Sequence, residues 1–309
     1  MNRPTNKIMI ERYLLHYRDS PQSVKTRRSA LEYFFGNIYF NYNGHVYDIT
    51  RSILIDYFEY LNYHKNLAFK TKQLKWIILK SFLQFSMEYY DDFIIKIPQK
   101  TIKWKKRHKE PRSNADIIMT IEEVKKILDY LKLNDYTFYL IFRIFAETGM
   151  RKGGLISIDY DKVSIESRYI DTYEKYGDRK CYYMSKGLAK HLDFYLSMRK
   201  TIKTNSKALF LSNRLNRFNL RTFNQYLKEV IKEVGIEKNI TCHTFRRTLN
   251  TLRFHMGCDD RKMCILLNHA VNGVNFNSYV KFEKDSEDGH YKEFLGYYDK
   301  WNPYKDVQL

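Results

Sequence analysis

One strongly charged segment divides this chain into two parts. Residues 103–116 read KWKKRHKEPRSNAD, with one proline and almost nothing apolar, which is the composition of a linker. Shortly after it, Thr120 is followed three residues later by Glu123, just ahead of an apolar run at helical spacing. This capping box marks the start of a helix and of a new domain. We therefore predict three segments: a domain over residues 1–104, a basic linker over 105–116 and a domain over 117–309.

Both domains are expected to be largely helical. The 309 residues include only 12 Gly and 5 Pro, and the 44% hydrophobic content is ample for packed cores. Apolar periodicity and capping signals predict four helices before the linker. They cover residues 6–17, 21–36, a segment from a cap at Asp48 or Thr50 to Leu61, and 69–90. In the last of these, Leu74, Ile77, Ile78, Phe82 and Phe85 are predicted to face the core, with the lysines between them on the other face.

The second domain mixes helices with a short β-segment. Residues 135–148 are predicted to form a buried helix that ends at Thr148-Gly149, whereas residues 162–184 have a two-residue period typical of a hairpin. Helices are expected again at about 186–199, 219–234, 243–256, 259–268, 273–281 and 287–298. The predicted fold class is mainly α (α+β): a four-helix N-terminal domain and a mostly helical second domain with a small antiparallel sheet or hairpin.

The chain is basic along its whole length. Its 54 Lys and Arg against 35 Asp and Glu give a formal charge of +19. Residues 1–116 contain 21 basic and 11 acidic residues, so about half of the excess lies in each domain. Two basic domains suit a protein that wraps nucleic acid, with an anionic membrane surface as the competing partner. A Lys-rich composition inherited from an AT-rich genome is the non-functional explanation.

The sequence favours a cytoplasmic, nucleoid-associated protein. The longest apolar runs are far shorter than a membrane span, and the first twenty residues have neither the pattern nor the cleavage site of a signal peptide. The four cysteines form no CxxC pair, and Cys258, Cys264 and His255 fit no zinc spacing. We therefore predict no metal, no membrane partner and reduced, buried cysteines.

Five side chains of the second domain suit phosphodiester chemistry. They are Arg151 in TGMR, His243 and Arg246 in HTFRR, His269 in LLNH and Tyr279 in NSYV. Two guanidiniums and two imidazoles can bind and neutralise a phosphodiester, and a tyrosine hydroxyl can attack it. His243 and Arg246 are three residues apart on a predicted helix and so share a face. Thr241 can cap that helix, whose N-terminus itself favours a phosphate.

The predicted reaction needs neither a metal nor ATP. Most phosphoryl-transfer sites hold Mg²⁺ with carboxylates, but no paired-carboxylate motif stands beside these basic motifs. Each oxyanion-type donor contributes about 3–4 kcal/mol in a transition state, so two arginines and a histidine can replace the metal. A tyrosine–phosphate ester keeps the energy of the cleaved bond, so the strand can be resealed. Lys175 on the hairpin is the candidate that protonates the leaving 5′ oxygen, with Lys180 as the alternative if the register differs.

These motifs resemble the tyrosine recombinase (phage integrase) family, which includes the Xer-type enzymes and archaeal integrases. The resemblance is carried by ETGMRKGGL, by HTFRRTLNTLRFHMGCDDRKMCILLNH and by NSYVKF, with the second histidine 26 positions after the first. ITRSILIDYFEYL and MTIEEVKKIL resemble the family's DNA-clamping domain and the first helix of its catalytic domain. The resemblance implies a catalytic set of Arg151, Lys175, His243, Arg246, His269 and Tyr279.

Two positions depart from the family pattern. An acidic residue usually stands three positions after the first arginine, where this chain has Gly154, and Glu147 or Asp159 could take its role. The nucleophilic tyrosine usually follows the second histidine by nine residues, and here it follows by ten. The alternatives to Tyr279 are Tyr291, Tyr297 and Tyr298.

The predicted function is site-specific DNA recombination through a 3′-phosphotyrosyl intermediate. The resemblance implies double-stranded DNA as the partner, a homo-tetramer on two DNA sites and no cofactor. The tail EKDSEDGHYKEFLGYYDKW could pack on a neighbouring subunit or on its own domain. The alternative functions are a type IB topoisomerase-like relaxing enzyme and a non-catalytic DNA-binding descendant. The residues expected to contact DNA phosphates are Lys72, Lys75, Lys103, Lys105, Lys106 and Arg107.

Overall fold

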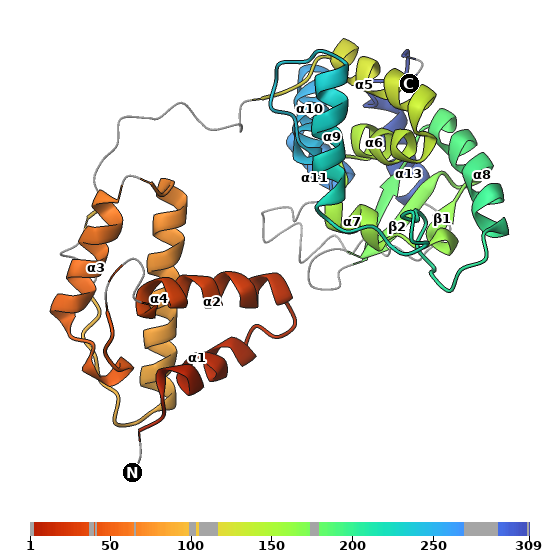
Figure 1. Cartoon of the computed structure of the whole chain (residues 1–309). Coiled ribbons are helices and arrows are strands. Elements are labelled where there is room, and N and C mark those ends of the chain that lie inside the picture. The colour runs from red at the N-terminus through yellow and green to blue at the C-terminus, as the bar shows by residue number, and fades with distance from the viewer. Residues whose placement is uncertain are drawn as a thin grey trace. The chain divides into compact units, whose positions relative to one another are not determined.

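The computed structural model describes residues 3–36, 40, 42–64, 66–98, 103–104, 117–173, 179–268, 290–307 and 309 of the chain. The chain forms two compact units, Met1–Glu110 and Pro111–Leu309 (Figure 1). Each unit has its own hydrophobic core. The linker predicted over 105–116 lies outside the described residues.

The described residues of the first unit form four α-helices, as predicted. These are α1 (Asn6–Leu15), α2 (Pro21–Phe35), α3 (Arg51–Tyr63) and α4 (Phe69–Tyr89). Local chemistry explains where they begin. The Thr50 hydroxyl accepts a hydrogen bond from the amide of Ile53 at 3.3 Å, and Pro21 occupies the first position of α2, where a missing amide proton costs nothing. The first core is rich in aromatic rings, with Phe34 and Tyr57 in edge-to-face contact at 4.8 Å between ring centroids.

Helix α4 buries only part of the predicted set of apolar residues. Ile78 and Phe82 are buried and Phe85 packs partly against the core, as predicted. Leu74 and Ile77 were also expected in the core but are 45% and 59% exposed, and Trp76 and Leu79 are buried instead. The ring of Phe82 lies against α1 and α2. Because α4 carries apolar residues on more than one side, its packing against those helices decides which side is buried.

The second unit is mostly helical with one small sheet, as predicted. Its described helices are α5 (Ile121–Asn134), α6 (Tyr136–Thr148), α7 (Lys152–Ser157), α8 (Lys186–Thr201), α9 (Thr222–Glu233), α10 (Cys242–His255), α11 (Asp260–Leu266) and α13 (His290–Lys300). The helix predicted over 273–281 lies outside the described residues. Among the helices that the structure describes, none combines the length and the apolar character needed to cross a bilayer.

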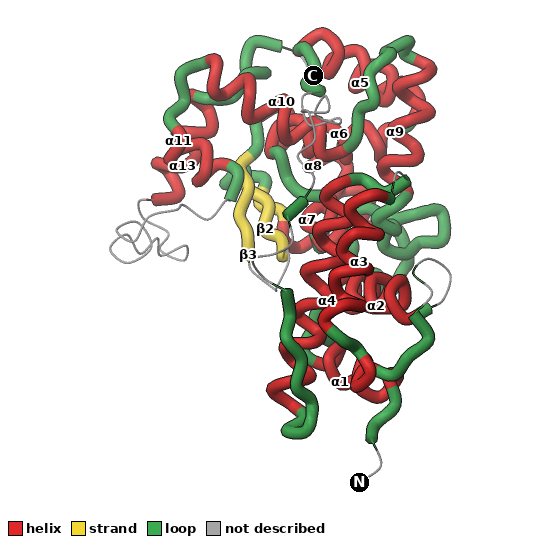
Figure 2. Tube along the Cα trace, turned by 90° about the vertical axis from the view of Figure 1, so that its left-hand side faces the viewer, coloured by secondary structure: helices red, strands yellow, loops and turns green. Residues whose placement is uncertain are grey.

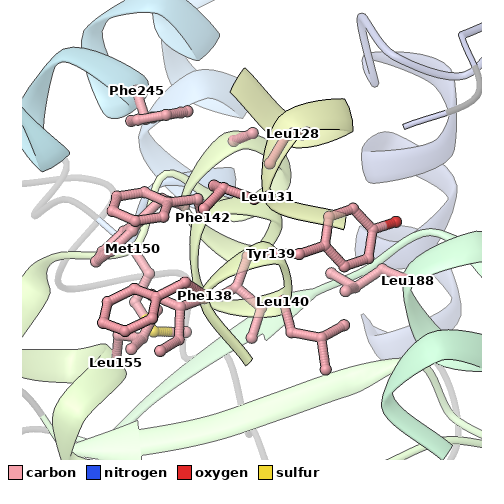
Figure 3. Packing of buried hydrophobic residues seen from close by; sticks show 14 of the residues in the cluster. Leu128, Leu131, Phe138, Tyr139, Leu140, Phe142, Met150, Leu155, Leu188 and Phe245 are labelled. Atoms are coloured by element: carbon pink, nitrogen blue, oxygen red, sulfur yellow. The ribbon is translucent and has the colours of Figure 1, made fainter. Parts of the chain in front are cut away.

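Helix α6 is the centre of the second unit. Every residue from Phe138 to Thr148 is buried. Figure 3 shows why: side chains of α5, α7, α8 and α10 surround α6, with Phe245 on one side and Leu188 on another. The predicted capping box starts α5, since the Thr120 amide donates to the Glu123 carboxylate at 2.8 Å and the Glu123 amide to the Thr120 hydroxyl at 3.2 Å.

The sheet is antiparallel with the strand order β1 (Val163–Ser164), β2 (Tyr169–Tyr173) and β3 (Arg179–Tyr183). Its register places Thr172 opposite Lys180 and Tyr173 opposite Arg179. The predicted hairpin is therefore confirmed, while residues 174–178 between its strands lie outside the described part. Figure 2 shows β2 and β3 side by side, and β2 also contacts α7.

The described C-terminal residues pack on the second unit itself. Helix α13 contacts α11 and β3, and the Asp299 carboxylate accepts two hydrogen bonds from Arg168, at 3.1 and 2.6 Å. The hydroxyl of Tyr139 donates to the carbonyl of Leu309 at 2.9 Å, and Leu309 is buried. The described part of the tail, residues 290–301, thus contacts its own domain.

Candidate active site

Arg246 joins three segments that are far apart in the sequence. It lies on α10 with only 4% of its surface exposed. Its Nη1 donates to the carbonyl of Gly149 at 2.6 Å and its Nη2 to the carbonyl of Leu267 at 2.8 Å. Gly149 ends α6 two residues before Arg151, and Leu267 follows α11 two residues before His269. One guanidinium fork thus holds together the backbone next to two other predicted catalytic residues.

Gly149 permits this close approach. Its φ of +63° lies in the left-handed region, which residues with a side chain rarely adopt. A Cβ at this position would lie 2.8 Å from Cδ2 of Leu267 and 3.2 Å from Cδ2 of Leu249. Two features therefore require the glycine of TGMR: the left-handed backbone turn, and the close contact with α10 and the end of α11.

His243 lies within the electrostatic reach of three arginines. It is the second residue of α10, and Arg151 is the N-cap of α7. Partial burial and then the positive charges of Arg247, Arg246 and Arg151 lower the pKa of His243 below its ordinary value. The charge of Arg151 thus acts on His243 despite the long sequence separation. The lowered pKa favours a neutral imidazole at pH 7, which can accept a proton.

Arg247 was not among the site residues predicted from the sequence. Among the charged neighbours of His243, it has the largest effect on the histidine pKa. It also donates to the hydroxyl of Thr244 at 3.2 Å. The signal was present in the sequence, because Arg247 follows His243 by four residues and so shares its helix face.

The end of α11 is also tied to the sheet. Asn268 adopts φ of +52°, and its side-chain amide donates to the carbonyl of Cys181 on β3 at 2.7 Å. Asparagine is one of the few residues with a side chain that tolerates this backbone region. The cluster therefore comprises the start of α7, the N-terminal half of α10, the end of α11 and one strand of the hairpin.

Three predicted catalytic residues lie outside the described residues: Lys175, His269 and Tyr279. Two of the alternative tyrosines are described. Tyr298 is buried, which raises its pKa well above the ordinary value, and its hydroxyl donates to Glu147 at 2.9 Å. Tyr297 donates to Glu293. Both hydroxyls are therefore engaged with carboxylates in this arrangement. Lys180, the alternative to Lys175, is half-buried on β3.

Both acidic residues considered as replacements at Gly154 have other partners. Glu147 is buried and accepts from Arg143 Nε at 2.9 Å, from the amide of Ser185 at 3.1 Å and from Tyr298. Asp159 forms an ion pair with Arg217. The carbonyl of Gly154 itself accepts hydrogen bonds from two hydroxyls, those of Thr172 and Ser157.

The predicted DNA contacts of the first unit need one correction. Lys72 is only 1% exposed, and its ammonium donates to the carbonyl of Asn62 at 3.3 Å, so it has no surface to offer to a phosphate. Lys75 is half-buried with its Nζ 3.6 Å from the centre of the Tyr33 ring, and burial lowers its pKa. Lys103 is exposed. Lys105, Lys106 and Arg107 lie outside the described residues.

The described residues contain no group of three or more His, Cys, Asp or Glu side chains that could hold a metal ion. All four cysteines are free. Cys242 and Cys258 are buried, and burial raises the pKa of Cys242 to about 12. A thiol of this kind packs as a small apolar side chain.

The second unit is thus a helical scaffold with a small antiparallel sheet that gathers arginines and a histidine at one point. Residues 118–284, more than half of the chain, match the phage integrase family. The chain therefore belongs to the phage integrase family, that of the tyrosine recombinases.

Individual relatives agree with this assignment. The tyrosine recombinase XerC of Caldanaerobacter subterraneus is 30% identical over 161 residues, which cover 50% of this chain and 44% of the relative. The XerC of Chlamydia caviae is 24% identical over 211 residues, or 67% of this chain and 66% of the relative. The chain thus spans less than two thirds of the length of these two relatives.

Solved structures share the fold. The XerH site-specific recombinase bound to difH substrate has a TM-score of 0.64 at 18% identity, over 85% of this chain and 76% of that one. The Tn1549 transposon integrase in complex with transposon right end DNA has a TM-score of 0.66 at 15% identity, over 88% and 95%.

Proposed function

We propose that this chain is a site-specific DNA recombinase that cuts and rejoins duplex DNA through a 3′-phosphotyrosyl intermediate. The observation that carries the proposal is the double hydrogen bond of Arg246, which ties the backbone beside Arg151 to the end of α11. The charges of both arginines also reach His243. Two guanidiniums beside a neutral imidazole can bind a phosphodiester anion and accept a proton from an attacking hydroxyl.

In the proposed cleavage step, the hydroxyl oxygen of Tyr279 attacks the scissile phosphorus, and the bond to the 5′ oxygen breaks. His243 accepts the tyrosine proton, and the ammonium of Lys175 gives a proton to the departing 5′ oxygen. Arg151, Arg246 and His269 stabilise the charge that builds on the non-bridging oxygens. Because the phosphotyrosine keeps the energy of the cleaved bond, a 5′-hydroxyl can reverse the reaction without ATP or a metal.

The proposal includes a DNA clamp made of the two basic units. The net charge of +19 supports it, and so does the exposed Lys103 that follows the first unit's core. We further propose a tetramer on two DNA sites. A lambda integrase of the same fold has been solved as a tetramer bound to a Holliday junction, at 15% identity and a TM-score of 0.63.

A nicked suicide duplex tests the catalytic part. The DNA that flanks the gene supplies candidate sites, and a nick next to the scissile position lets the short strand diffuse away, so that the covalent complex accumulates. The wild-type protein should form a denaturant-resistant protein–DNA adduct, and Tyr279→Phe should form none. Failure of the wild type on every flanking site contradicts the proposal. Adduct formation by Tyr279→Phe would mean that another tyrosine, such as Tyr291, is the nucleophile.

A second assay separates recombination from simple relaxation. Two copies of a site that traps the protein are placed in one supercoiled plasmid, and a matched plasmid carries one copy. A recombinase should produce deletion or inversion products from the two-site plasmid alone. Relaxation of both plasmids without rearranged products would favour a type IB topoisomerase-like activity instead.

A further inference from the structure

Two hydroxyls contact the backbone carbonyl of Gly154, the position at which the family resemblance implies an acidic residue. Thr172 Oγ1 donates to the carbonyl of Gly154, and Ser157 Oγ lies 2.9 Å from the same oxygen. The two hydroxyl oxygens are 2.6 Å apart, and Ser157 Oγ also lies 2.7 Å from the carbonyl of Tyr173. Two hydroxyl protons are therefore shared among two backbone carbonyls and the hydroxyls themselves. We call Ser157 and Thr172 the hydroxyl pair.

The hydroxyl pair links two segments that lead to the candidate site. Gly154 and Ser157 belong to α7, whose N-cap is Arg151. Thr172 and Tyr173 end β2, and Lys175 follows Tyr173 by two residues in the sequence. Thr172 is 1% exposed, so water cannot readily replace its hydrogen bonds if they are lost.

The pairing within the sheet explains why Thr172 faces α7. Successive side chains of a strand point to opposite faces, and Ile170, two residues earlier, is fully buried on the same face. Asp171, on the other face, pairs with Arg179 at 2.7 Å. The strand therefore presents one hydroxyl to α7 and uses its carboxylate elsewhere.

We propose that Ser157 and Thr172 are positioning residues for DNA cleavage. They hold the first turn of α7 and the end of β2 at a fixed separation, so that Arg151 and the general acid Lys175 act on the same phosphate. This inference rests on the proposed function. Position 154 of this chain has no carboxylate, and in the proposal the neutral hydroxyl pair aligns Arg151 and Lys175 in its place. The hydroxyl pair touches neither substrate nor reacting atoms and acts only through the backbone.

A sulfur-substituted substrate isolates this effect. In the cleavage step, the bond from tyrosine oxygen to phosphorus forms, the bond from phosphorus to the 5′ atom breaks, and the electron pair leaves with that atom. An oxygen leaving group needs a proton from the general acid, whereas sulfur leaves readily as a thiolate because a thiol is far more acidic than an alcohol. A misplaced general acid should therefore slow cleavage at 5′ oxygen and leave cleavage at 5′ sulfur nearly unchanged.

The experiment compares single-turnover cleavage of two suicide duplexes that differ only in oxygen or sulfur at the scissile 5′ position. The variants are Thr172→Val, which keeps the side-chain volume, Ser157→Ala, and Thr172→Ser, which keeps the hydroxyl. Thr204→Val is the matched control, because its hydroxyl donates to the carbonyl of Leu215 at 2.9 Å in the same unit. Lys175→Ala lacks the proposed general acid, so its two cleavage rates show the pattern expected when that acid is missing.

We expect Thr172→Val and Ser157→Ala to cleave the oxygen substrate about tenfold more slowly, because each variant loses one buried hydrogen bond. Both variants should cleave the sulfur substrate at nearly the wild-type rate. Thr172→Ser and Thr204→Val should behave like the wild type. Wild-type rates of Thr172→Val on both substrates overturn the inference, and so does an equal loss on both, which would show that the general acid is still aligned. If the wild-type protein cleaves neither substrate, the proposed function itself fails.

Discussion

The hydroxyl of Tyr298 on α13 donates to the carboxylate of Glu147 on α6 at 2.9 Å, inside the core of the second unit. Arg143 and the amide of Ser185 are the other donors to this carboxylate. Three donors on one buried carboxylate satisfy a charge that would otherwise be costly to bury. The C-terminal helix is therefore held by a polar contact to the helix that leads to Arg151.

Replacing Tyr298 by Phe should destabilise the protein. The change removes a hydrogen bond to a buried charged group, which is worth about 1.5–3 kcal/mol, and keeps the aromatic ring. The free energy of unfolding from urea titration measures the effect. Tyr297→Phe is the control, because Tyr297 pairs with Glu293 on the surface of α13 and should change stability by less than about 0.5 kcal/mol. Equal effects of the two variants would contradict the account.

Gly149→Ala should cost more stability than either of two matched glycine variants. It combines a left-handed φ with a Cβ that would lie 2.8 Å from Leu267. At Gly235, φ is +65° and nothing lies within 4 Å, so Gly235→Ala isolates the backbone term of about 1–2 kcal/mol. Gly153→Ala, in α7 with open space around it, should be neutral or slightly stabilising.

The expected order of destabilisation is therefore Gly149→Ala, then Gly235→Ala, then Gly153→Ala, measured by thermal or urea unfolding. A Gly149→Ala variant no less stable than Gly235→Ala would show that the contact with Leu267 is unimportant.

Arg246→Lys should abolish most cleavage although it keeps the positive charge. A lysine ammonium is a point donor and cannot bridge the carbonyls of Gly149 and Leu267 as the guanidinium fork does. We expect covalent adduct to form about 100-fold more slowly or not at all, as for loss of a preorganised donor. Arg214→Lys, at an exposed loop position, is the control. A near-normal rate for Arg246→Lys would mean that charge alone suffices.

The charge of Arg247 should set the acidic limit of activity. His243 acts as a base only when neutral, and the arginines beside it lower its pKa, which keeps it neutral at lower pH. Arg247→Gln removes the charge with the largest effect on His243, so it should raise the pKa of His243 toward its ordinary value. The acidic limb of the pH–rate profile for single-turnover cleavage should then move to higher pH. An unchanged or opposite displacement of this limb would rule out the proposed influence of Arg247.

Much of the architecture was predictable from local pattern. The capping box at Thr120 and Glu123, the buried run that became α6 and the two-residue period of β2 and β3 all depend on interactions between near neighbours in the chain. The pairing of His243 with Arg246 follows in the same way, because three residues on a helix share a face. Motif order and spacing then pointed to the family that the comparison confirmed.

The orientation of α4 was not predictable in this way. Periodicity shows which residues share a helix face, but it does not show which face is buried when apolar residues occupy more than one. Lys72 thus lies in the interior beside Asn62, and Ile77 lies at the surface.

The sequence by itself determined most of the helices, the hairpin and the residue types of the site, but not the short helix α7 that follows Arg151. Only the tertiary structure decided that the guanidinium of Arg246 donates to the carbonyls of Gly149 and Leu267. It also decided that Glu147 accepts hydrogen bonds from Arg143 and Tyr298. The physical reason is that a buried polar group must find a partner, and any of several segments distant in sequence can provide one. Which segment does so depends on how the helices pack around α6, a property of the whole core and not of any single stretch of the chain.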